Sequence, residues 1–268
     1  MSGARIGFVG GGKMGGGIIH GLVQQGVVPP AEIVVCEPVA RRRQELAERY
    51  GVTVTGDYRP ALAAEAVVLA VKPQEFAKAA KEMRGELRPD ALLISIMAGV
   101  TLERMLAALP AARAVRVMPN LGATVGESFS AWYGTPAITK ADREQVRALL
   151  GAIGREHEFA DERYMEMATA VVGSGPGFVA LLIEALIDGA VYIGLPRDVS
   201  TEMVLQTVLG TARVLQESGQ NAAELRGQVM SPGGTTAEGL LALERGGARA
   251  TLMQAVIAAF EKSKALGA

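Results

Sequence analysis

The chain has 268 residues, which suits one large domain or two smaller ones, and 49% of them are hydrophobic, so a sizeable core can form. The formal net charge of −1 argues against a nucleic acid or an anionic membrane surface as a partner. Cys36 is the only cysteine, which excludes an intrachain disulfide and fits a reducing compartment, so we expect a cytoplasmic protein. Because no stretch of about 18 uncharged apolar residues occurs, we expect no membrane span.

The first predicted element is a short buried strand at 5–9, followed by a glycine-rich turn and a helix. Gly10, Gly12 and Gly15 fit the spacing GxGxxG. A match alone is weak, but this one lies between a strand and a helix and leads to a second strand at 32–36, which is the context of a dinucleotide-binding turn. Gly10 would form the tight turn, Gly12 would let the backbone approach a pyrophosphate, and Gly15 would let the helix pack on the strand. The pyrophosphate would lie at the helix N-terminus.

Glu37 follows the second strand, about 25 residues after Gly12. This is close to the position of the acid that hydrogen-bonds the adenosine ribose, which favours NADH and repels the extra phosphate of NADPH. Arg41, Arg42 and Arg43 come next and can hold that phosphate instead, or simply form a solvated first turn of the following helix. The sequence leaves NADH and NADPH open, with a slight lean to NADH.

Apolar strand-like runs and helical patterns alternate through the rest of the first half. We expect strands at 66–71, 91–97, 114–118 and 128–133, and helices at 38–50, 75–84, 101–109 and 140–153. This alternation predicts a parallel sheet with helices on both faces. Ligands of such sheets bind beyond the carboxyl ends of the strands, where Lys72, Ala98 and Asn120 lie, although these are otherwise ordinary loop positions.

No strand is predicted after Asp161. Helices are expected at about 163–172, 178–193, 200–217, 221–228, 235–245 and 247–265. The fold class is therefore α/β, with an N-terminal Rossmann-type doubly wound parallel sheet over 1–160 and an all-helical C-terminal domain over 161–268. Long apolar helices with few charges indicate a core that a second chain completes, so we expect a homodimer through these helices, with a higher oligomer of dimers left open.

The turn before the helix at 235–245 indicates a small-anion site. Gly233 and Gly234 let the backbone curl, while Ser231, Thr235 and Thr236 supply hydroxyl groups. Because the helix begins at once, free backbone N–H groups would point at a bound anion. The alternative is an ordinary capped helix start after a Pro-Gly turn.

Seven motifs in one order together resemble pyrroline-5-carboxylate reductase over nearly the whole chain. They are GFVGGGKMG at 7–15, AVKPQ at 70–74, SIMAGVTL at 95–102, RVMPN at 116–120, VVGSGPGFV at 171–179, GLPR at 194–197 and MSPGGTT at 230–236. The resemblance implies hydride transfer from NADH or NADPH to the cyclic C=N bond of 1-pyrroline-5-carboxylate, giving L-proline in the last step of proline biosynthesis.

The resemblance also assigns roles to residues, and none of them is a metal ligand. The substrate carboxylate would bind backbone amides of the Ser231–Thr236 turn, between the two domains and across a dimer interface. Thr236 would be the catalytic residue that hydrogen-bonds the ring nitrogen. We expect its hydroxyl to orient the nitrogen, because it is too weak an acid to supply the proton alone at neutral pH. The cofactor would contact the glycine turn with Lys13 and Met14, then Glu37, Ala70, Val71, Lys72 and Pro73 around the ribose, and Asn120 near the nicotinamide.

Several positions depart from the usual pattern of the family. Lys13 stands where Asn or Gln is common, Leu121-Gly122 replaces Thr-Pro, and Gly177-Phe178 replaces Ala-Tyr. The position of Glu37 is often a small hydroxyl residue in members that prefer NADP. These differences leave the reaction class intact and leave the cofactor preference open.

Three other functions fit part of the pattern. A 3-hydroxyacid dehydrogenase benefits from a His or Lys base, but the helical half has no His and its only lysines are Lys262 and Lys264. A non-catalytic dinucleotide sensor would leave the Ser231–Thr236 turn without a purpose, and binding without turnover would favour it. A reductase of a six-membered cyclic imine fits the same motifs.

Overall fold

The computed structural model describes residues 5–267, which form two compact units. The first unit runs up to Gly173 and also includes the segment from Ala259 onward, whereas the second is Ser174–Ala258. The chain therefore passes twice between the units, once after the sheet and once within its last helix. The predicted division at residue 160 stays a prediction.

The first unit is built on one eight-stranded sheet. The strands are β1 (Ile6–Val9), β2 (Ile33–Cys36), β3 (Thr53–Thr55), β4 (Ala66–Leu69), β5 (Leu92–Ser95), β6 (Arg113–Met118), β7 (Ser128–Gly134) and β8 (Gly154–Glu158). They lie in the order β3-β2-β1-β4-β5-β6-β7-β8, and every neighbouring pair is parallel except β6 with β7. The direction of winding reverses between β1 and β4, which is where doubly wound sheets bind dinucleotides. The predicted α/β class is confirmed.

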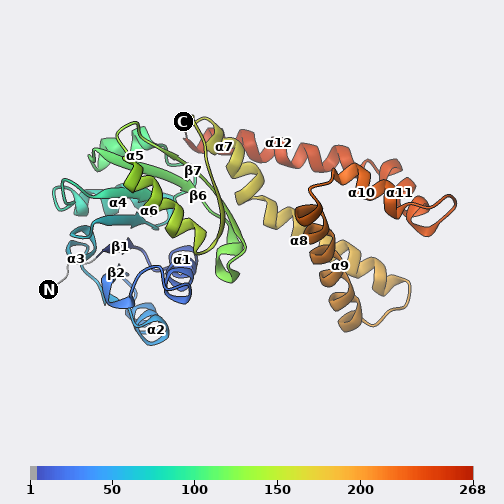
Figure 1. Cartoon of the computed structure of the whole chain (residues 1–268), viewed down its shortest axis with the longest axis horizontal. Helices are drawn as coiled ribbons and strands as arrows, with labels where there is room; N and C mark the ends of the chain where they lie inside the picture. Colours follow the sequence, from blue (N-terminus) through green and yellow to red (C-terminus); the bar gives the residue numbers. More distant parts are fainter. Residues whose placement is uncertain (1–4, 268) are drawn as a thin grey trace. The chain divides into compact units, whose positions relative to one another are not determined.

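Helices close both faces of this sheet (Figure 1). They are α1 (Lys13–Gln24), α2 (Ala40–Tyr50), α3 (Arg59–Leu62), α4 (Pro73–Met83), α5 (Leu102–Ala108) and α6 (Lys140–Gly151). Side chains alternate between the two faces along each strand. Val68 of β4 belongs to the core that Ile19 of α1 and Leu149 of α6 share. Its neighbour Val67 belongs to the opposite core, with Phe76 of α4.

Three strands toward the two sides of the sheet, β3, β7 and β8, differ from the sequence prediction. β7 was expected to complete the parallel sheet, but it runs antiparallel to β6. The short connection between these strands has no crossover helix, only the 3-10 turn η2 (Leu121–Val125), and a parallel return needs a dozen or more residues. β3 and β8 were not predicted, because three residues are too few to show a pattern and the GREHE sequence of β8 is polar.

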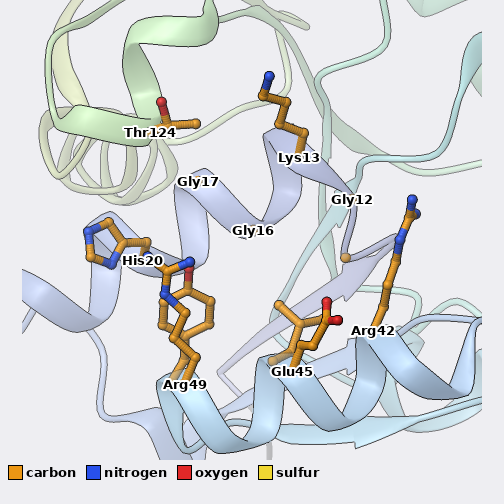
Figure 2. Close-up of a pocket in the computed structure, with 12 residues that line it drawn as sticks. Gly12, Lys13, Gly16, Gly17, His20, Arg42, Glu45, Arg49 and Thr124 are labelled. Atoms are coloured by element: carbon orange, nitrogen blue, oxygen red, sulfur yellow. The ribbon is translucent and has the colours of Figure 1, made fainter.

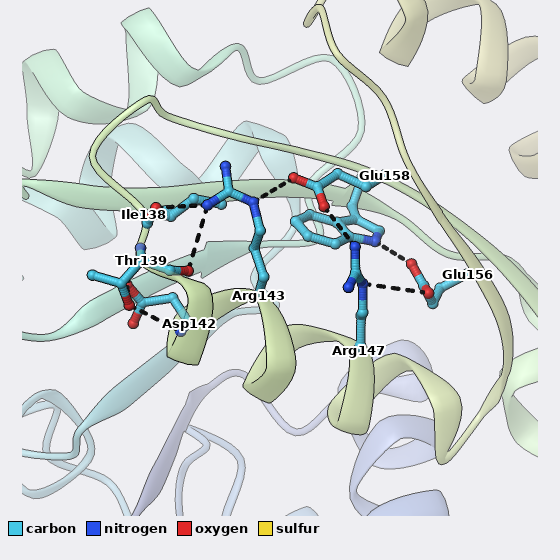
Figure 3. A network of polar contacts seen from close by, with 8 residues as sticks. Ile138, Thr139, Asp142, Arg143, Arg147, Glu156 and Glu158 are labelled. Atoms are coloured by element: carbon cyan, nitrogen blue, oxygen red, sulfur yellow. Dashed lines mark hydrogen bonds and ion pairs between the residues drawn. The ribbon is translucent and has the colours of Figure 1, made fainter.

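Polar contacts join the edge strand β8 to α6 and β7 (Figure 3). Arg143 and Arg147 of α6 donate hydrogen bonds of 2.8 and 3.0 Å to the carboxylate of Glu158. The indole N–H of Trp132 in β7 donates to Glu156 at 2.5 Å. Charged side chains on an edge strand also discourage pairing with a further strand.

The segment after β8 is anchored on the sheet by two ion pairs with one buried arginine. Arg116 of β6 is 2% exposed and donates to Glu162 at 3.0 Å and to Glu166 at 2.8 Å. Glu166 lies on α7 (Tyr164–Ala168). A π-turn, η3 (Thr169–Gly173), separates α7 from the next helix. The sequence predicted helices at 163–172 and 178–193, and the structure places the irregular turn between them about four residues earlier than the predicted gap.

The second unit is helical, as the sequence predicted. It contains α8 (Gly175–Tyr192), α9 (Arg197–Ser218), α10 (Ala222–Val229), α11 (Thr235–Arg245) and most of α12 (Ala248–Gly267). α8 packs against α9. Among the described residues from 174 to 258, Ser200 alone is buried, and no apolar side chain is.

One described helical stretch, Tyr164–Tyr192, is long and apolar enough to cross a membrane by length and composition, with a mean hydropathy of 1.9 in its most apolar window. No span was expected from the sequence, because the run contains Glu184 and Asp188 and so is not free of charges. Only 6% of that window is buried within the single chain. Such exposure is what a helix covered by a second protein chain shows before assembly.

Candidate functional site

The glycine-rich turn joins β1 to α1 in a shape that needs glycine. Gly10 has a φ of +105°, and a Cβ there would lie 2.7 Å from the carbonyl oxygen of Ala70. A Cβ on Gly15 would lie 2.5 Å from the carbonyl oxygen of Gly10. Gly12 is the N-cap of α1 without a side-chain hydrogen bond, and no atom lies within 4 Å of where its Cβ would be. The open, uncapped helix start fits the phosphates of a dinucleotide.

Glu37 lies against this turn and is 3% exposed. Its carboxylate accepts hydrogen bonds from the backbone N–H groups of Gly11 and Val39, each at 3.0 Å. The guanidinium of Arg43 donates to the carbonyl oxygens of Glu37 and Pro38, at 2.7 and 2.9 Å. The acid is therefore where its spacing predicted, with both oxygens bonded to backbone; its contact with a ribose stays a prediction.

The three consecutive arginines have different surroundings. The exposed side chain of Arg41 pairs with Glu45 at 2.8 Å on the surface of α2. Arg43 is engaged with backbone carbonyl oxygens. Arg42 lines a cavity that also includes Gly12 and Lys13 of the glycine turn (Figure 2). Of the three, Arg42 is therefore the one that lines the cavity beside the phosphate-binding turn.

This cavity has a volume of about 320 Å³ and extends from the glycine turn along the groove between α1 and α2. Gly16 and Gly17 of α1 line it and carry no side chains that would fill it. His20 and Thr124 border it as well (Figure 2). Neither this cavity nor a role for His20 was predicted from the sequence. The available signal was the pair of glycines inside a helix, which costs about 1 kcal/mol for each residue relative to alanine.

Two further candidate segments follow β4 and β6. The N–H of Ala70 donates to the carbonyl of Val9 at 2.8 Å, which places the start of the 70–73 segment beside the glycine turn. Lys72 is exposed and is the N-cap of α4. Asn120 accepts a hydrogen bond from the N–H of Gly122 at 3.0 Å and so caps η2. β1, β4, β5 and β6 are parallel, so these segments share one edge of the sheet.

The predicted anion turn is a tight turn directly before α11. Gly233 has a φ of +66°, and the N–H of Gly234 donates to the carbonyl of Ser231 at 3.0 Å. Gly234 is the N-cap of α11 and supplies no side-chain cap. Thr235 and Thr236 are the first two residues of the helix, and within the described part of the chain their hydroxyl groups have no hydrogen-bond partner. The turn thus presents an uncapped helix start and free hydroxyl groups.

The structure brings predicted cofactor-binding residues together at one edge of the sheet. Gly10, Gly12, Glu37 and Ala70 lie together at the carboxyl ends of β1, β2 and β4. The Ser231–Thr236 turn is built entirely within the second unit. The roles of these residues in cofactor and substrate binding stay predictions.

Comparison with known proteins matches the chain over its full length. Pyrroline-5-carboxylate reductase of Synechocystis is 40% identical over 265 residues, covering 98% of each chain, and that of Arabidopsis thaliana is 38% identical, covering 98% of this chain and 95% of the relative. The chain belongs to the pyrroline-5-carboxylate reductase family. A solved pyrroline-5-carboxylate reductase from Coxiella burnetii is 33% identical with a TM-score of 0.91, and both chains are covered completely.

Two family models match separate parts of this reductase-family chain. A model described as pyrroline-5-carboxylate reductase dimerisation matches residues 162–266, which supports formation of a homo-oligomer. A model described as NADP oxidoreductase, coenzyme F420-dependent, matches residues 5–99, which contain the glycine turn. A Plasmodium falciparum pyrroline carboxylate reductase with NADP bound is 31% identical with a TM-score of 0.90 over the whole of both chains. The expected NAD(P)-dependent oxidoreductase with a Rossmann-type domain is confirmed.

Proposed function

We propose that this chain reduces 1-pyrroline-5-carboxylate to L-proline, the last step of proline biosynthesis. The observation that carries the proposal is the full-length similarity to reductases of that name, at 40% identity for the Synechocystis protein. The uncapped starts of α1 and α11 support it, because they offer one anion site for a dinucleotide and another for a carboxylate. When bound, the reduced nicotinamide supplies the hydride that converts the C=N bond to an amine.

The first unit would hold the cofactor at the carboxyl edge of its sheet. Gly12, Lys13 and Met14 would direct backbone N–H groups at the pyrophosphate. The segment Ala70–Pro73 would line the ribose, and Asn120 would lie near the nicotinamide. The conformation of Gly10 and the open backbone at Gly12 support this assignment.

The second unit would hold the substrate through the Ser231–Thr236 turn. Backbone N–H groups at the start of α11 would bind the carboxylate, with Ser231 and Thr235 beside them. The unpartnered hydroxyl of Thr236 would hydrogen-bond the ring nitrogen and fix the orientation of the C=N bond for hydride transfer. The proton on nitrogen would come from solvent or arrive with the substrate.

NADH is proposed as the preferred cofactor. The buried carboxylate of Glu37 lies beside the glycine turn, where it would repel the additional phosphate of NADPH. Among the neighbouring arginines, Arg42 is the residue that lines the cavity with Gly12 and would offset this repulsion.

The oligomer is proposed to be a homodimer through the helices of the 161–268 region, with dimers able to assemble further, and to act in the cytoplasm. The match of the dimerisation model to residues 162–266 and the lack of buried apolar side chains from 174 to 258 support this division and interface. The buried free thiol of Cys36 supports a reducing compartment.

The direct test is loss of the reduced-nicotinamide absorbance band when 1-pyrroline-5-carboxylate is added, with NADH and NADPH in parallel assays and proline identified as the product. We expect turnover with both cofactors and a larger kcat/KM for NADH. The six-membered cyclic imine serves as the comparison substrate. Cofactor binding without turnover of either imine would overturn the proposal.

A further inference from the structure

The Glu37 carboxylate accepts hydrogen bonds from two backbone segments, the glycine turn and the residue before α2. One carboxylate oxygen accepts from Gly11 in the glycine turn and the other accepts from Val39 at the start of α2, each at 3.0 Å. We propose that Glu37 is a positioning residue that holds the phosphate-binding turn in its shape, so that NADH and NADPH both depend on it. This goes beyond the ribose contact that its spacing predicts.

The burial of Glu37 and the tight packing of Gly11 support this positioning role. Glu37 is 3% exposed, so its carboxylate lies beneath the turn and offers little surface to a ribose. A Cβ on Gly11 would lie 2.4 Å from a methyl carbon of Leu46 and 3.2 Å from one of Val35, so this part of the turn packs tightly on β2 and α2. A backbone N–H buried in such a place needs an acceptor, and the carboxylate supplies one.

Arg43 in turn holds Glu37 in place. Arg43 donates to the carbonyl oxygens of Glu37 and Pro38, so the main chain and the side chain of Glu37 are both held. Hydrogen bonds to an ionised carboxylate are stronger than neutral ones. Gly11 directly precedes Gly12, the N-cap of α1, so a change in the Gly11 amide changes where the first N–H groups of the helix point.

The inference rests on the proposed function to the extent that this turn binds the cofactor. A residue that only contacts the ribose would lower NADH binding and, once its charge is removed, improve NADPH binding. A residue that positions the turn would lower binding of both, because the pyrophosphate is common to the two. The turn would also lose order before any cofactor is added.

The experiment uses Glu37→Gln in the full-length protein, because glutamine replaces one accepting oxygen with a donor amide. Hydrogen exchange of the Gly11 amide is measured without cofactor, and dissociation constants are measured for NADH and NADPH. We expect faster exchange at Gly11 and weaker binding of both cofactors, about tenfold for NADH and less for NADPH, because the substitution also removes the charge that repels the additional phosphate. Gln44→Ala is the matched control on α2, since its side chain is exposed and donates a hydrogen bond to Glu48; it should change neither quantity.

Unchanged exchange at Gly11, or NADPH binding as tight as in the unmodified protein, would overturn the proposal. If Glu37→Gln does not fold, Glu37→Asp replaces it, because the shorter side chain keeps the charge and cannot maintain both bonds. The exchange measurement needs no turnover. A failure of the proposed reductase function would appear separately, as absence of catalysis by the unmodified protein.

Discussion

The two units of this chain bury their apolar side chains in opposite ways. In the first unit, helices close both faces of the sheet, and side chains such as Phe8, Ile94 and Trp132 are fully buried. In the second, no apolar side chain from 174 to 258 is buried, and Leu181 and Met253 are 64% and 60% exposed. A single chain therefore completes the core of the cofactor unit and leaves that of the helical unit open.

Catalysis therefore depends on two units that are completed in different ways. The cofactor turn depends on packing and hydrogen bonds within one chain, such as those of Gly11 with Glu37. The Ser231–Thr236 turn belongs to a unit whose helices need a second copy to bury their apolar faces. Substitutions in the two units should therefore fail in different ways.

The largest effect is expected from a charge on the exposed apolar surface of α8. Leu181→Glu or Leu186→Glu would place a carboxylate in the proposed interface between copies, where burial without a partner is costly. We expect the mass in solution, measured by light scattering, to fall to that of one chain and turnover to be lost. Val125→Glu is the control, since Val125 is 74% exposed in the first unit. An unchanged mass for both α8 variants would contradict the inference that the helical unit needs a second copy.

A cavity in the sheet core should instead destabilise the first unit. Ile94 is fully buried, so Ile94→Ala is expected to lower the free energy of unfolding by about 3 kcal/mol. Trp132 is the only tryptophan and lies in the same unit, so its fluorescence during urea unfolding reports this unit alone. Val125→Ala should change the value by less than about 0.5 kcal/mol. Equal effects of the two substitutions would mean that the sheet core does not stabilise this unit.

Removing the Thr236 hydroxyl from the Ser231–Thr236 turn, the proposed substrate site, should lower turnover without affecting folding. Thr236→Ala is expected to lower kcat/KM by about 10- to 100-fold, the range for one hydrogen bond to a charged group. Thr211→Ala is the matched control, because the hydroxyl of Thr211 is bonded to the carbonyl of Thr207 at 2.8 Å. Full kcat/KM in Thr236→Ala would show that this hydroxyl does not orient the substrate.

The sequence predicted the regular elements of the fold better than it predicted individual contacts between residues. The alternation of apolar strands and helices predicted the parallel core of the sheet, and the 3.6-residue period predicted the later helices. The polar strand β8 and the antiparallel direction of β7 were not predicted, because GREHE has no apolar pattern and an apolar run does not show in which direction a strand pairs. Spacing placed Glu37 beside the turn but could not show its bonds to Gly11 and Val39, since every residue other than proline offers the same backbone N–H.

The smallest effect is expected from Cys36 at high pH. Burial, with the negative charges of Asp57 and Glu37, raises the pKa of this thiol from 9.0 to about 11. The unfolded chain therefore loses the proton first, so stability falls as the pH rises from 9 to 11. Urea midpoints at pH 8 and pH 10 should drop more for the unmodified protein than for Cys36→Ala. An equal drop in both would contradict the raised pKa.

The most direct test of the central claim is the mass of the unmodified protein in solution, measured together with its turnover as the protein is diluted. The account predicts a multiple of the chain mass at micromolar concentration, with activity per chain falling as single chains appear. A stable single chain with undiminished turnover would contradict it, because the helical unit would then need no second copy.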